Sequence, residues 1–361
     1  MENQIIKQDI RALSLPALKE AFVNMGEKPF RAQQVYEWLW KKSARSFESM
    51  SNLSKELRTQ LEQHYVINAV SIQSYQKSKD RTIKNGFRLA DGNLVEGVLI
   101  PNTDRMTACV SSQVGCSLTC KFCATGYMDR KRNLNADEIY DQVVLLNEQS
   151  TSFYERPLTN IVYMGMGEPL LNYANVLQSI DRITAEDGLN MSYKRITVST
   201  AGIAKMIRKL GEDEVKFNLA LSLHAANDAK RNEIMPINES NTLEALADAL
   251  KYYYEKTQNP VTYEYIIFSG VNDEIEDARE LVEFCAHIPC KVNIIEYNPI
   301  ALAEYINAQE DKVESFADYL RRNGVITNIR RSRGKDIDAA CGQLAAGQPI
   351  KLGARRVVTA E

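Results

Sequence analysis

Three cysteines lie within one run of eight residues, which reads Cys116-Ser-Leu-Thr-Cys120-Lys-Phe-Cys123. Three thiolates at this spacing suit a cube of four irons better than any other common metal site. The run would hold three of the irons and leave the fourth open to bind a small molecule. A structural zinc ion prefers a closed set of four ligands, and the other cysteines include no second C-x2-C pair. Three adjacent thiols without a metal are the remaining alternative.

Four further cysteines lie outside this run. Cys109 precedes the run by seven residues, in an expected strand, and its side chain should point into or beside the same site. Cys341 lies among small residues near the C-terminus, in a loop-like stretch that suits a mobile, nucleophilic thiolate. Cys285 and Cys290 are interpreted as small hydrophobes, which is the usual role of a free buried cysteine.

Strand-like and helix-like segments alternate from residue 105 onward, and they must position these cysteines. The expected strands cover 107–111, 160–164, 195–199, 217–222, 262–268 and 292–296, and the expected helices cover 137–148, 173–185, 203–210, 242–256 and 275–287. A βαβα series of this kind predicts a parallel sheet. Six strands fall short of the eight in a closed barrel, so we predict an α/β fold with a partial (β/α)6 TIM-like barrel. A doubly wound sheet is the alternative.

Polar residues follow five of the six expected strands, at the edge where barrels carry their chemistry. The cysteine run follows the first strand. The second strand is followed by Gly165-Met-Gly167-Glu168, whose glycines allow a ligand to approach closely and whose carboxylate can accept bonds from an ammonium group. Each such segment alone is equally well a turn or a helix cap. Together they outline one pocket, to which the later strands add Ser199, Ser222, Leu223, His224 and Asn298.

The remaining parts of the chain have different patterns. Residues 1–75 read as a small helical N-terminal domain, with a helix start at Ser14-Leu-Pro16. Residues 76–104 change to short strands, with Asn85-Gly86 and Asp91-Gly92 as turn signals. The barrel is expected over 105–300, and a C-terminal extension that carries Cys341 is expected over 301–361.

The composition is that of an ordinary folded protein, with 361 residues, 44% hydrophobic, 25% charged and a net charge of −3. Neither a signal peptide nor a membrane-spanning run is evident, so we expect a cytoplasmic monomer with no membrane partner. The net charge gives no sign of a nucleic-acid partner, which would have to bind local basic runs. These runs, each equally well a solvated face, are 130–132, 194–195, 330–335 and the set Lys28, Arg31, Lys41, Lys42 and Arg45.

Nearly the whole chain resembles the RlmN family of dual-specificity RNA adenine C2-methyltransferases, which belong to the radical S-adenosylmethionine enzymes. The most specific matching blocks are 109–126, 165–172, 222–225 and 336–344. The resemblance implies methylation of C2 of adenosine 2503 in 23S rRNA and of adenosine 37 in some tRNAs. The sister family Cfr methylates C8 of the same rRNA base and typically has GMGEALAN where this chain has Gly-Met-Gly-Glu-Pro-Leu-Leu-Asn. This difference favours C2.

The resemblance also implies a role for each candidate residue. Cys341 would carry the methyl group, Cys109 would resolve the intermediate, and Glu96 would accept a proton. Taken alone, Glu96 reads as an outward-facing strand carboxylate. A 4Fe-4S cluster would be held by Cys116, Cys120 and Cys123, and S-adenosylmethionine by Gly167, Glu168, Ser199, Ser222, Leu223, His224 and Asn298.

The implied reaction consumes two S-adenosylmethionine molecules per turnover. The first methylates Cys341, and the second yields a radical that takes hydrogen from this methyl group. The RNA would then be joined to Cys341 and released by Cys109, while flavodoxin or ferredoxin would supply electrons. The alternatives are a Cfr-like C8 enzyme, a radical S-adenosylmethionine enzyme for a small molecule, and an RNA-binding module with structural zinc.

Overall fold

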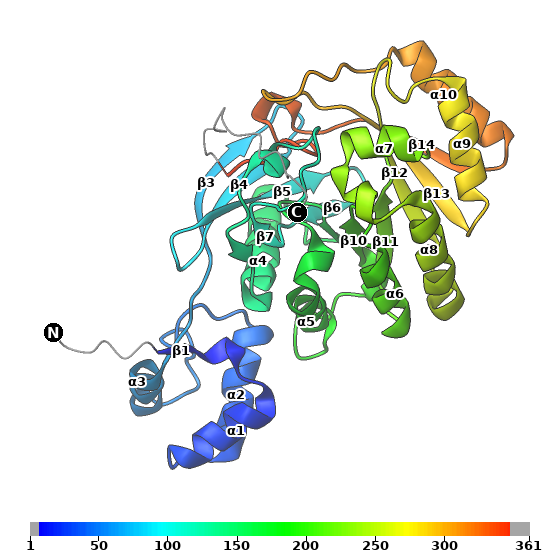
Figure 1. Cartoon of the computed structure of the whole chain (residues 1–361). Helices are drawn as coiled ribbons and strands as arrows, with labels where there is room; N and C mark the ends of the chain where they lie inside the picture. Colours follow the sequence, from blue (N-terminus) through cyan, green and yellow to red (C-terminus); the bar gives the residue numbers. More distant parts are fainter. Residues whose placement is uncertain (1–6, 347–361) are drawn as a thin grey trace, which may run out of the picture.

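The computed structural model describes residues 7–346. A curved ten-stranded sheet forms the centre of the larger part of the molecule (Figure 1). Seven neighbouring strands are parallel and follow one another in chain order. A doubly wound sheet would reverse its strand order at a switch point, so that alternative is wrong and the partial barrel is confirmed. The seven strands are β6 (Met106–Cys109), β9 (Asn160–Tyr163), β10 (Ile196–Thr200), β11 (Asn218–Ser222), β12 (Val261–Ile267), β13 (Cys290–Glu296) and β14 (Ile326–Arg330).

The sheet has one parallel strand more than the six that the sequence predicts. The extra strand is β14, and the helix before it, α10 (Glu310–Arg322), is also missing from the prediction. The signal for α10 is nevertheless present, because Val313, Phe316, Ala317 and Leu320 recur at helical spacing and are buried. At the edge of the sheet β14 buries only Thr327, so no apolar alternation marks it.

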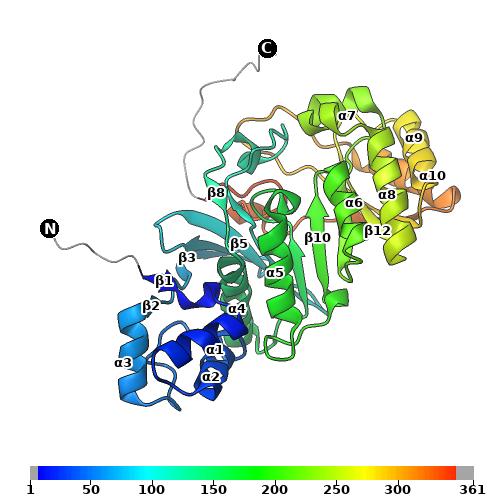
Figure 2. The same ribbon diagram turned by 60° about the horizontal axis from the view of Figure 1, so that its bottom comes forward.

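Helices connect consecutive parallel strands and cover the outer face of the sheet (Figure 1, Figure 2). The five predicted helices are all present, and α4 is longer than expected because it continues to Tyr154. Among residues 7–346, no helix is both long and apolar enough to cross a bilayer. The helices are α4 (Ala136–Tyr154), α5 (Tyr173–Thr184), α6 (Ala204–Glu212), α7 (Asp228–Ile234), α8 (Leu243–Thr257) and α9 (Ile275–Cys285).

Three antiparallel strands extend the sheet beyond β6, namely β5 (Leu94–Pro101), β4 (Ile83–Arg88) and β3 (Ser71–Lys77). The turn predicted at Asp91-Gly92 is confirmed, and Gly92 has a φ of +80° that favours glycine. The turn predicted at Asn85-Gly86 is wrong, because both residues lie inside β4. The buried Asn85 side chain exchanges hydrogen bonds of 2.8 and 2.9 Å with Gln149 of α4. This tertiary contact overrides the local preference for a turn.

The N-terminal residues form a small helical unit beside α4 (Figure 2). Its helix α1 begins where predicted, because the Ser14 hydroxyl accepts a hydrogen bond from the Ala17 N–H and Pro16 fits the first turn. The helical stretch ends earlier than expected, since β3 already begins at Ser71. The elements of the unit are β1 (Gln8–Asp9), α1 (Leu15–Asn24), α2 (Pro29–Trp40), α3 (Lys55–His64) and β2 (Tyr65–Val66).

One buried cation joins this unit to the barrel. The guanidinium of Arg11, which is 4% exposed, lies 2.8 Å from Asp141 and 2.9 Å from Asp137 of α4. Burial raises the pKa of Asp137 to about 6, and the charge of Arg11 opposes this rise. The two carboxylates therefore depend on Arg11 to remain charged inside the protein.

Replacing Arg11 with Gln leaves the buried Asp141 and the largely buried Asp137 without their cation. We expect the free energy of unfolding to fall by about 3–5 kcal/mol, measured by chemical denaturation. The matched control is Arg45→Gln, which breaks an exposed ion pair between the same unit and Glu148 of α4. The control should cost about 0–1 kcal/mol, and equal costs for the two substitutions would contradict the role of Arg11.

Candidate active site

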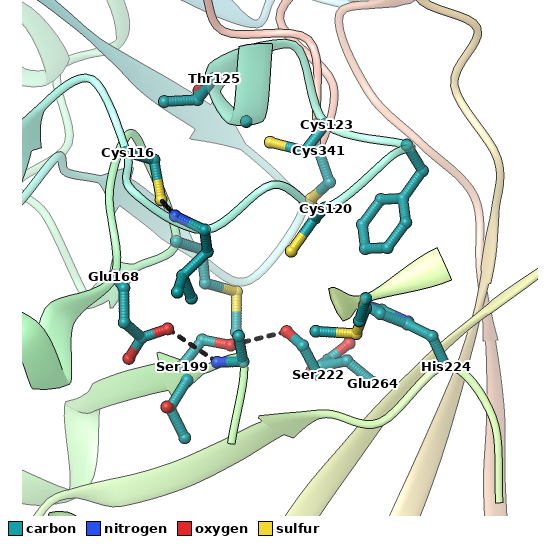
Figure 3. A pocket seen from close by; sticks show the side chains of 18 of the residues that line it. Cys116, Cys120, Cys123, Thr125, Glu168, Ser199, Ser222, His224, Glu264 and Cys341 are labelled. Carbon is teal, nitrogen blue, oxygen red and sulfur yellow. Dashed lines mark hydrogen bonds between the residues drawn. The ribbon is translucent and has the colours of Figure 1, made fainter. Parts of the chain in front are cut away.

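A pocket opens at the carboxyl ends of the barrel strands, and the three-cysteine run forms one of its walls (Figure 3). Its position confirms the expectation that polar residues after successive strands meet at one edge. Four of the predicted site residues are not part of its lining, namely Glu96, Cys109, Leu223 and Asn298. The predicted residues that line it are Cys116, Cys120, Cys123, Gly167, Glu168, Ser199, Ser222, His224 and Cys341.

The loop that carries the three cysteines lies between the short strands β7 (Gln113–Val114) and β8 (Arg132–Asn133). Two distant segments hold its backbone. The Lys121 N–H donates to the Ile234 carbonyl at 3.0 Å, and the Ala124 N–H donates to the Gly342 carbonyl at 2.6 Å. The positions of the thiols therefore depend on α7 and on the C-terminal segment.

The chemistry of the three thiols fits an iron–sulfur cluster. Burial raises the pKa of Cys116 to about 12 and also raises the pKa of Cys120 and of Cys123. Thiolates at this place therefore need a strongly cationic partner, which iron provides. Within residues 7–346, no three His, Cys, Asp or Glu side chains converge closely enough to hold one metal ion. A cluster binds each thiolate to a different iron, so its three thiolates need not converge on one ion.

The glycine loop after β9 brings its backbone against Gln113. Gly167 has a φ of +93°, and a Cβ there would lie 2.4 Å from the Gln113 Cβ, so a larger residue does not fit. The next carboxylate, Glu168, accepts hydrogen bonds from the Ala201 N–H at 2.7 Å and the Leu170 N–H at 3.0 Å. Burial raises the pKa of Glu168, and these donors oppose the rise. Both oxygens keep lone pairs that can accept bonds from a ligand ammonium group.

His224 is held as a neutral ring beside the pocket. Its backbone has a left-handed φ of +57°, and its Nδ1 accepts a hydrogen bond from the Ile266 N–H at 3.0 Å. Burial, with the nearby charge of Arg231, lowers the pKa of His224 to about 3. Phe122 of the cysteine run packs edge-on against the ring, with 4.7 Å between centroids. His224 can therefore donate one hydrogen bond from Nε2.

The buried Arg231, which no sequence motif marks, supports the strand ends that line the pocket. Arg231 of α7 donates to the carbonyls of Ala201, Ser222 and Leu223 at 2.6, 3.3 and 3.0 Å. It thereby joins the ends of β10 and β11, where the hydroxyls of Ser199 and Ser222 lie 3.4 Å apart. Leu223 is fully buried and is held here through its carbonyl. No sequence pattern marks Arg231, because its partners at these strand ends are carbonyls that every residue carries.

A second cavity adjoins the pocket and contains both Cys109 and Cys341, together with Cys123 and Arg330. Cys109 is 7% exposed at the end of β6, and burial and the nearby Cys341 raise its pKa to about 12. Cys341 is accessible from the cavity. Loss of hydration inside the cavity raises the pKa of the Cys341 thiol, and the guanidinium of Arg330 opposes the rise. The two thiols thus share one cavity, and the guanidinium of Arg330 favours their charged forms.

The cation beside these thiols comes from the basic run 330–335, which the sequence suggests as an RNA-binding surface. Arg330 instead pairs with Glu264 at 3.3 Å, and both residues line the pocket. Arg331 pairs with Glu296 at 3.1 Å, and Lys335 also contacts Glu296. Much of this run is therefore occupied by ion pairs within the protein.

Two further predicted residues hold the segment that carries Cys341. The Nδ2 of Asn298 donates to the Cys341 carbonyl at 3.2 Å, and its Oδ1 is buried without a partner among the described residues. Glu96 is buried, so its interpretation as an outward-facing carboxylate is wrong. Its Oε2 accepts a hydrogen bond from the Ala345 N–H at 2.8 Å. On β5 it shares a face with Val98, which lines the second cavity.

Two protein-family models match the chain. They describe the ribosomal RNA large subunit methyltransferase N-terminal domain, over residues 8–67, and the radical SAM superfamily, over residues 110–282. Among solved structures, the chain is similar to a radical SAM methyltransferase from Sphaerobacter thermophilus, with a TM-score of 0.89 and 38% identity. This similarity covers 94% of this chain and 99% of that one. Fold and site together define a radical S-adenosylmethionine methyltransferase.

Curated relatives narrow this class. A protein from Cytophaga hutchinsonii, named a probable dual-specificity RNA methyltransferase RlmN, is 66% identical over 95% of this chain and 94% of its own length. A dual-specificity RNA methyltransferase RlmN from Anaeromyxobacter dehalogenans is 44% identical over 94% and 92%. The chain belongs to the RlmN family of dual-specificity RNA methyltransferases. Membership implies an iron–sulfur cluster, S-adenosylmethionine and RNA substrates.

Replacing any one of Cys116, Cys120 and Cys123 with Ala removes one of the three thiolates. We expect the iron content of oxygen-free preparations to fall from about four atoms per chain to a small fraction of that value. Metal analysis and visible absorption measure this loss. The control is Cys290→Ala, because that thiol contacts the Cys285 carbonyl away from the pocket. Full iron content in any of the three variants would contradict the assignment.

Proposed function

We propose that this protein methylates C2 of adenosine 2503 in 23S rRNA and of adenosine 37 in tRNAs, through a methylated Cys341 and a covalent RNA–protein intermediate. The observation that carries the proposal is the position of Cys341, which lines both the pocket of the three cysteines and the cavity of Cys109. A methyl carrier has to reach both the methyl donor and the RNA base. Membership of the RlmN family supports RNA as the substrate.

The pocket residues bind the cofactors in this proposal. When bound, the cluster and S-adenosylmethionine supply a methyl group from one molecule and a hydrogen-abstracting radical from a second. Glu168 accepts bonds from the ammonium group of S-adenosylmethionine, and the buried wall around His224 excludes water. The proposed cluster ligands are Cys116, Cys120 and Cys123. The proposed S-adenosylmethionine ligands are Gly167, Glu168, Ser199, Ser222 and His224 of the pocket lining, together with Leu223 and Asn298, which lie outside that lining.

Cys341 is the proposed nucleophile, because adenine C2 is electron-poor and cannot itself attack the methyl donor. The Cys341 thiolate accepts the methyl group, and the charge of Arg330 favours that thiolate. After the methyl group has lost one hydrogen atom, its carbon bonds to C2 and joins the RNA to Cys341. The ring would then lose one electron, for which the iron–sulfur cluster held by the three cysteines would be the acceptor, and Glu96 accepts the C2 proton. Glu96 is free to do so once its bond to the Ala345 N–H has opened.

Cys109 releases the product in the last step. Its thiolate attacks the Cys341 sulfur, and the bond between that sulfur and the methylene carbon breaks. The electron pair stays with the carbon, which takes up a proton and becomes the methyl group. The two sulfurs are left as a disulfide, which an external reductant returns to thiols. We propose flavodoxin or ferredoxin as the electron source and a cytoplasmic monomer as the working form.

The position of the methyl group tests the proposal. Residues 165–172 read GMGEPLLN in place of the Cfr pattern, and we therefore expect 2-methyladenosine. The protein is expressed in a bacterial strain without its own RlmN, and nucleosides from rRNA and tRNA are analysed by liquid chromatography and mass spectrometry. Cys341→Ala should give none of this product. Formation of 8-methyladenosine instead would assign the protein to the Cfr reaction.

Replacing Cys109 with Ala removes the group that releases the product, so we expect RNA to accumulate on the protein through Cys341. Denaturing gel electrophoresis with nuclease treatment detects this adduct. The double substitution of Cys109 and Cys341 with Ala should abolish it, and Cys285→Ala should behave as the wild type. Recovery of free RNA only, from a Cys109→Ala protein with full iron content, would refute the role of Cys109.

A further inference from the structure

An exposed group of aromatic and basic side chains lies at the edge of the sheet, outside the site described above. Tyr75 of β3 and Phe153 of α4 are 53% and 41% exposed, and their rings lie 5.7 Å apart. Large exposed rings that gather in one place commonly mark a surface that a partner covers. This aromatic–basic surface consists of Tyr75, Lys77, Arg81, Phe153 and Arg156, together with Tyr154, which is only 9% exposed.

Cations lie over the rings of this surface. The Lys77 ammonium is 5.4 Å from the centroid of Phe153, and the Arg81 guanidinium is 4.7 Å from that of Tyr154. Arg81 has a left-handed φ of +74°, and its carbonyl accepts a hydrogen bond from the Tyr154 hydroxyl. A residue other than glycine keeps such a conformation only where its surroundings fix it. Arg81 is therefore held in position before a partner binds.

We propose that the aromatic–basic surface binds a single-stranded segment of the RNA substrate that flanks the target adenosine. This inference rests on the proposed function. Proteins bind single strands by stacking bases on aromatic rings and by placing cations along the phosphates, and this surface offers both. An exposed strand edge such as β3 can also pair with another peptide strand. Rings interleaved with cations fit a polyanion with planar bases better than they fit a peptide.

The surface leads toward the two reactive cysteines. Arg81, Tyr154 and Arg156 line a cleft of about 450 Å³ together with Arg333. Arg333 also lines the second cavity, which contains Cys109 and Cys341. Arg333 therefore links the cleft at this surface to the cavity in which the target base would react.

Acidic groups in the same segments do not cancel the positive charge. Asp80 lines the cleft, but its carboxylate accepts hydrogen bonds from the N–H groups of Gly334 and Thr82, each at 2.9 Å. Glu155 is exposed beside Arg156. Asp336 also lies near Asp80, and its carboxylate accepts hydrogen bonds from the Ser78 hydroxyl and the Lys79 N–H. The cations of the surface, with Arg333, still outnumber these three carboxylates, and the surface attracts phosphate.

Separate removal of the rings and of a cation tests the proposal. We expect Tyr75→Ala and Phe153→Ala each to weaken RNA binding about tenfold. Lys77→Gln should lower the slope of log K against log salt concentration by about 1. Fluorescence anisotropy of the cluster-loaded enzyme measures both effects, with a labelled 23S rRNA fragment in one arm and a labelled tRNA transcript in the other. A loss in both arms supports a common RNA surface, and a loss in one arm assigns the surface to that RNA.

The matched controls come from another cation–ring pair, on the outer helices of the barrel. Arg208 of α6 lies 4.4 Å from the Tyr252 ring of α8, and Arg208→Gln and Tyr252→Ala should bind RNA as the wild type does. Tyr75→Phe keeps a ring and should restore binding. Wild-type affinity and salt slope in all the surface variants would overturn this inference while leaving the proposed function intact. A wild-type enzyme that binds RNA but forms no 2-methyladenosine would overturn the proposed function instead.

Discussion

The segment around Cys341 has almost no regular secondary structure, so its position depends on bonds to elements that are distant in the sequence. The Gly342 carbonyl accepts a hydrogen bond from the Ala124 N–H of the cysteine loop, and the Leu344 carbonyl accepts one from the Thr125 hydroxyl at 2.7 Å. The carboxylate of Glu96, on strand β5, accepts a hydrogen bond from the Ala345 N–H. The segment is therefore held in place by hydrogen bonds both to the cysteine loop of the barrel and to the antiparallel strand β5. A shift of the cysteine loop or of β5 would move the Cys341 thiol relative to both the pocket and Cys109.

The pocket itself combines buried polar groups with backbone partners. Glu168 is held by two N–H groups, His224 by one, and Arg231 by carbonyls at the ends of two neighbouring strands. Each group would destabilise the protein if it were buried without these bonds. Because parallel strands end at the same edge, their terminal backbone groups are available there. The partial barrel thus supplies both the location of the site and the hydrogen bonds that keep it ordered.

Most of the fold is predictable from local patterns, since apolar periodicity and turn residues act over short distances. The six central strands and five helices follow this rule, and so does the cysteine run. The exceptions depend on tertiary contacts. Asn85 joins a strand because Gln149 is its partner, and Arg330 lines the pocket because Glu264 pairs with it. Gln149 and Glu264 lie far from their partners in the sequence, so local patterns cannot reveal these contacts. Glu96 is likewise buried through contacts with residues that are distant in the sequence.

The unequal exposure of the two thiols determines how the protein would be regenerated after each proposed reaction cycle. Cys109 is almost completely enclosed, whereas Cys341 is open to the cavity. An incoming thiol or electron carrier would thus meet the Cys341 sulfur first, and Cys109 would be the leaving group. The disulfide would then be reduced from the solvent side. Reduction could begin only after the RNA had left the cavity, because the bound RNA would block access to the Cys341 sulfur.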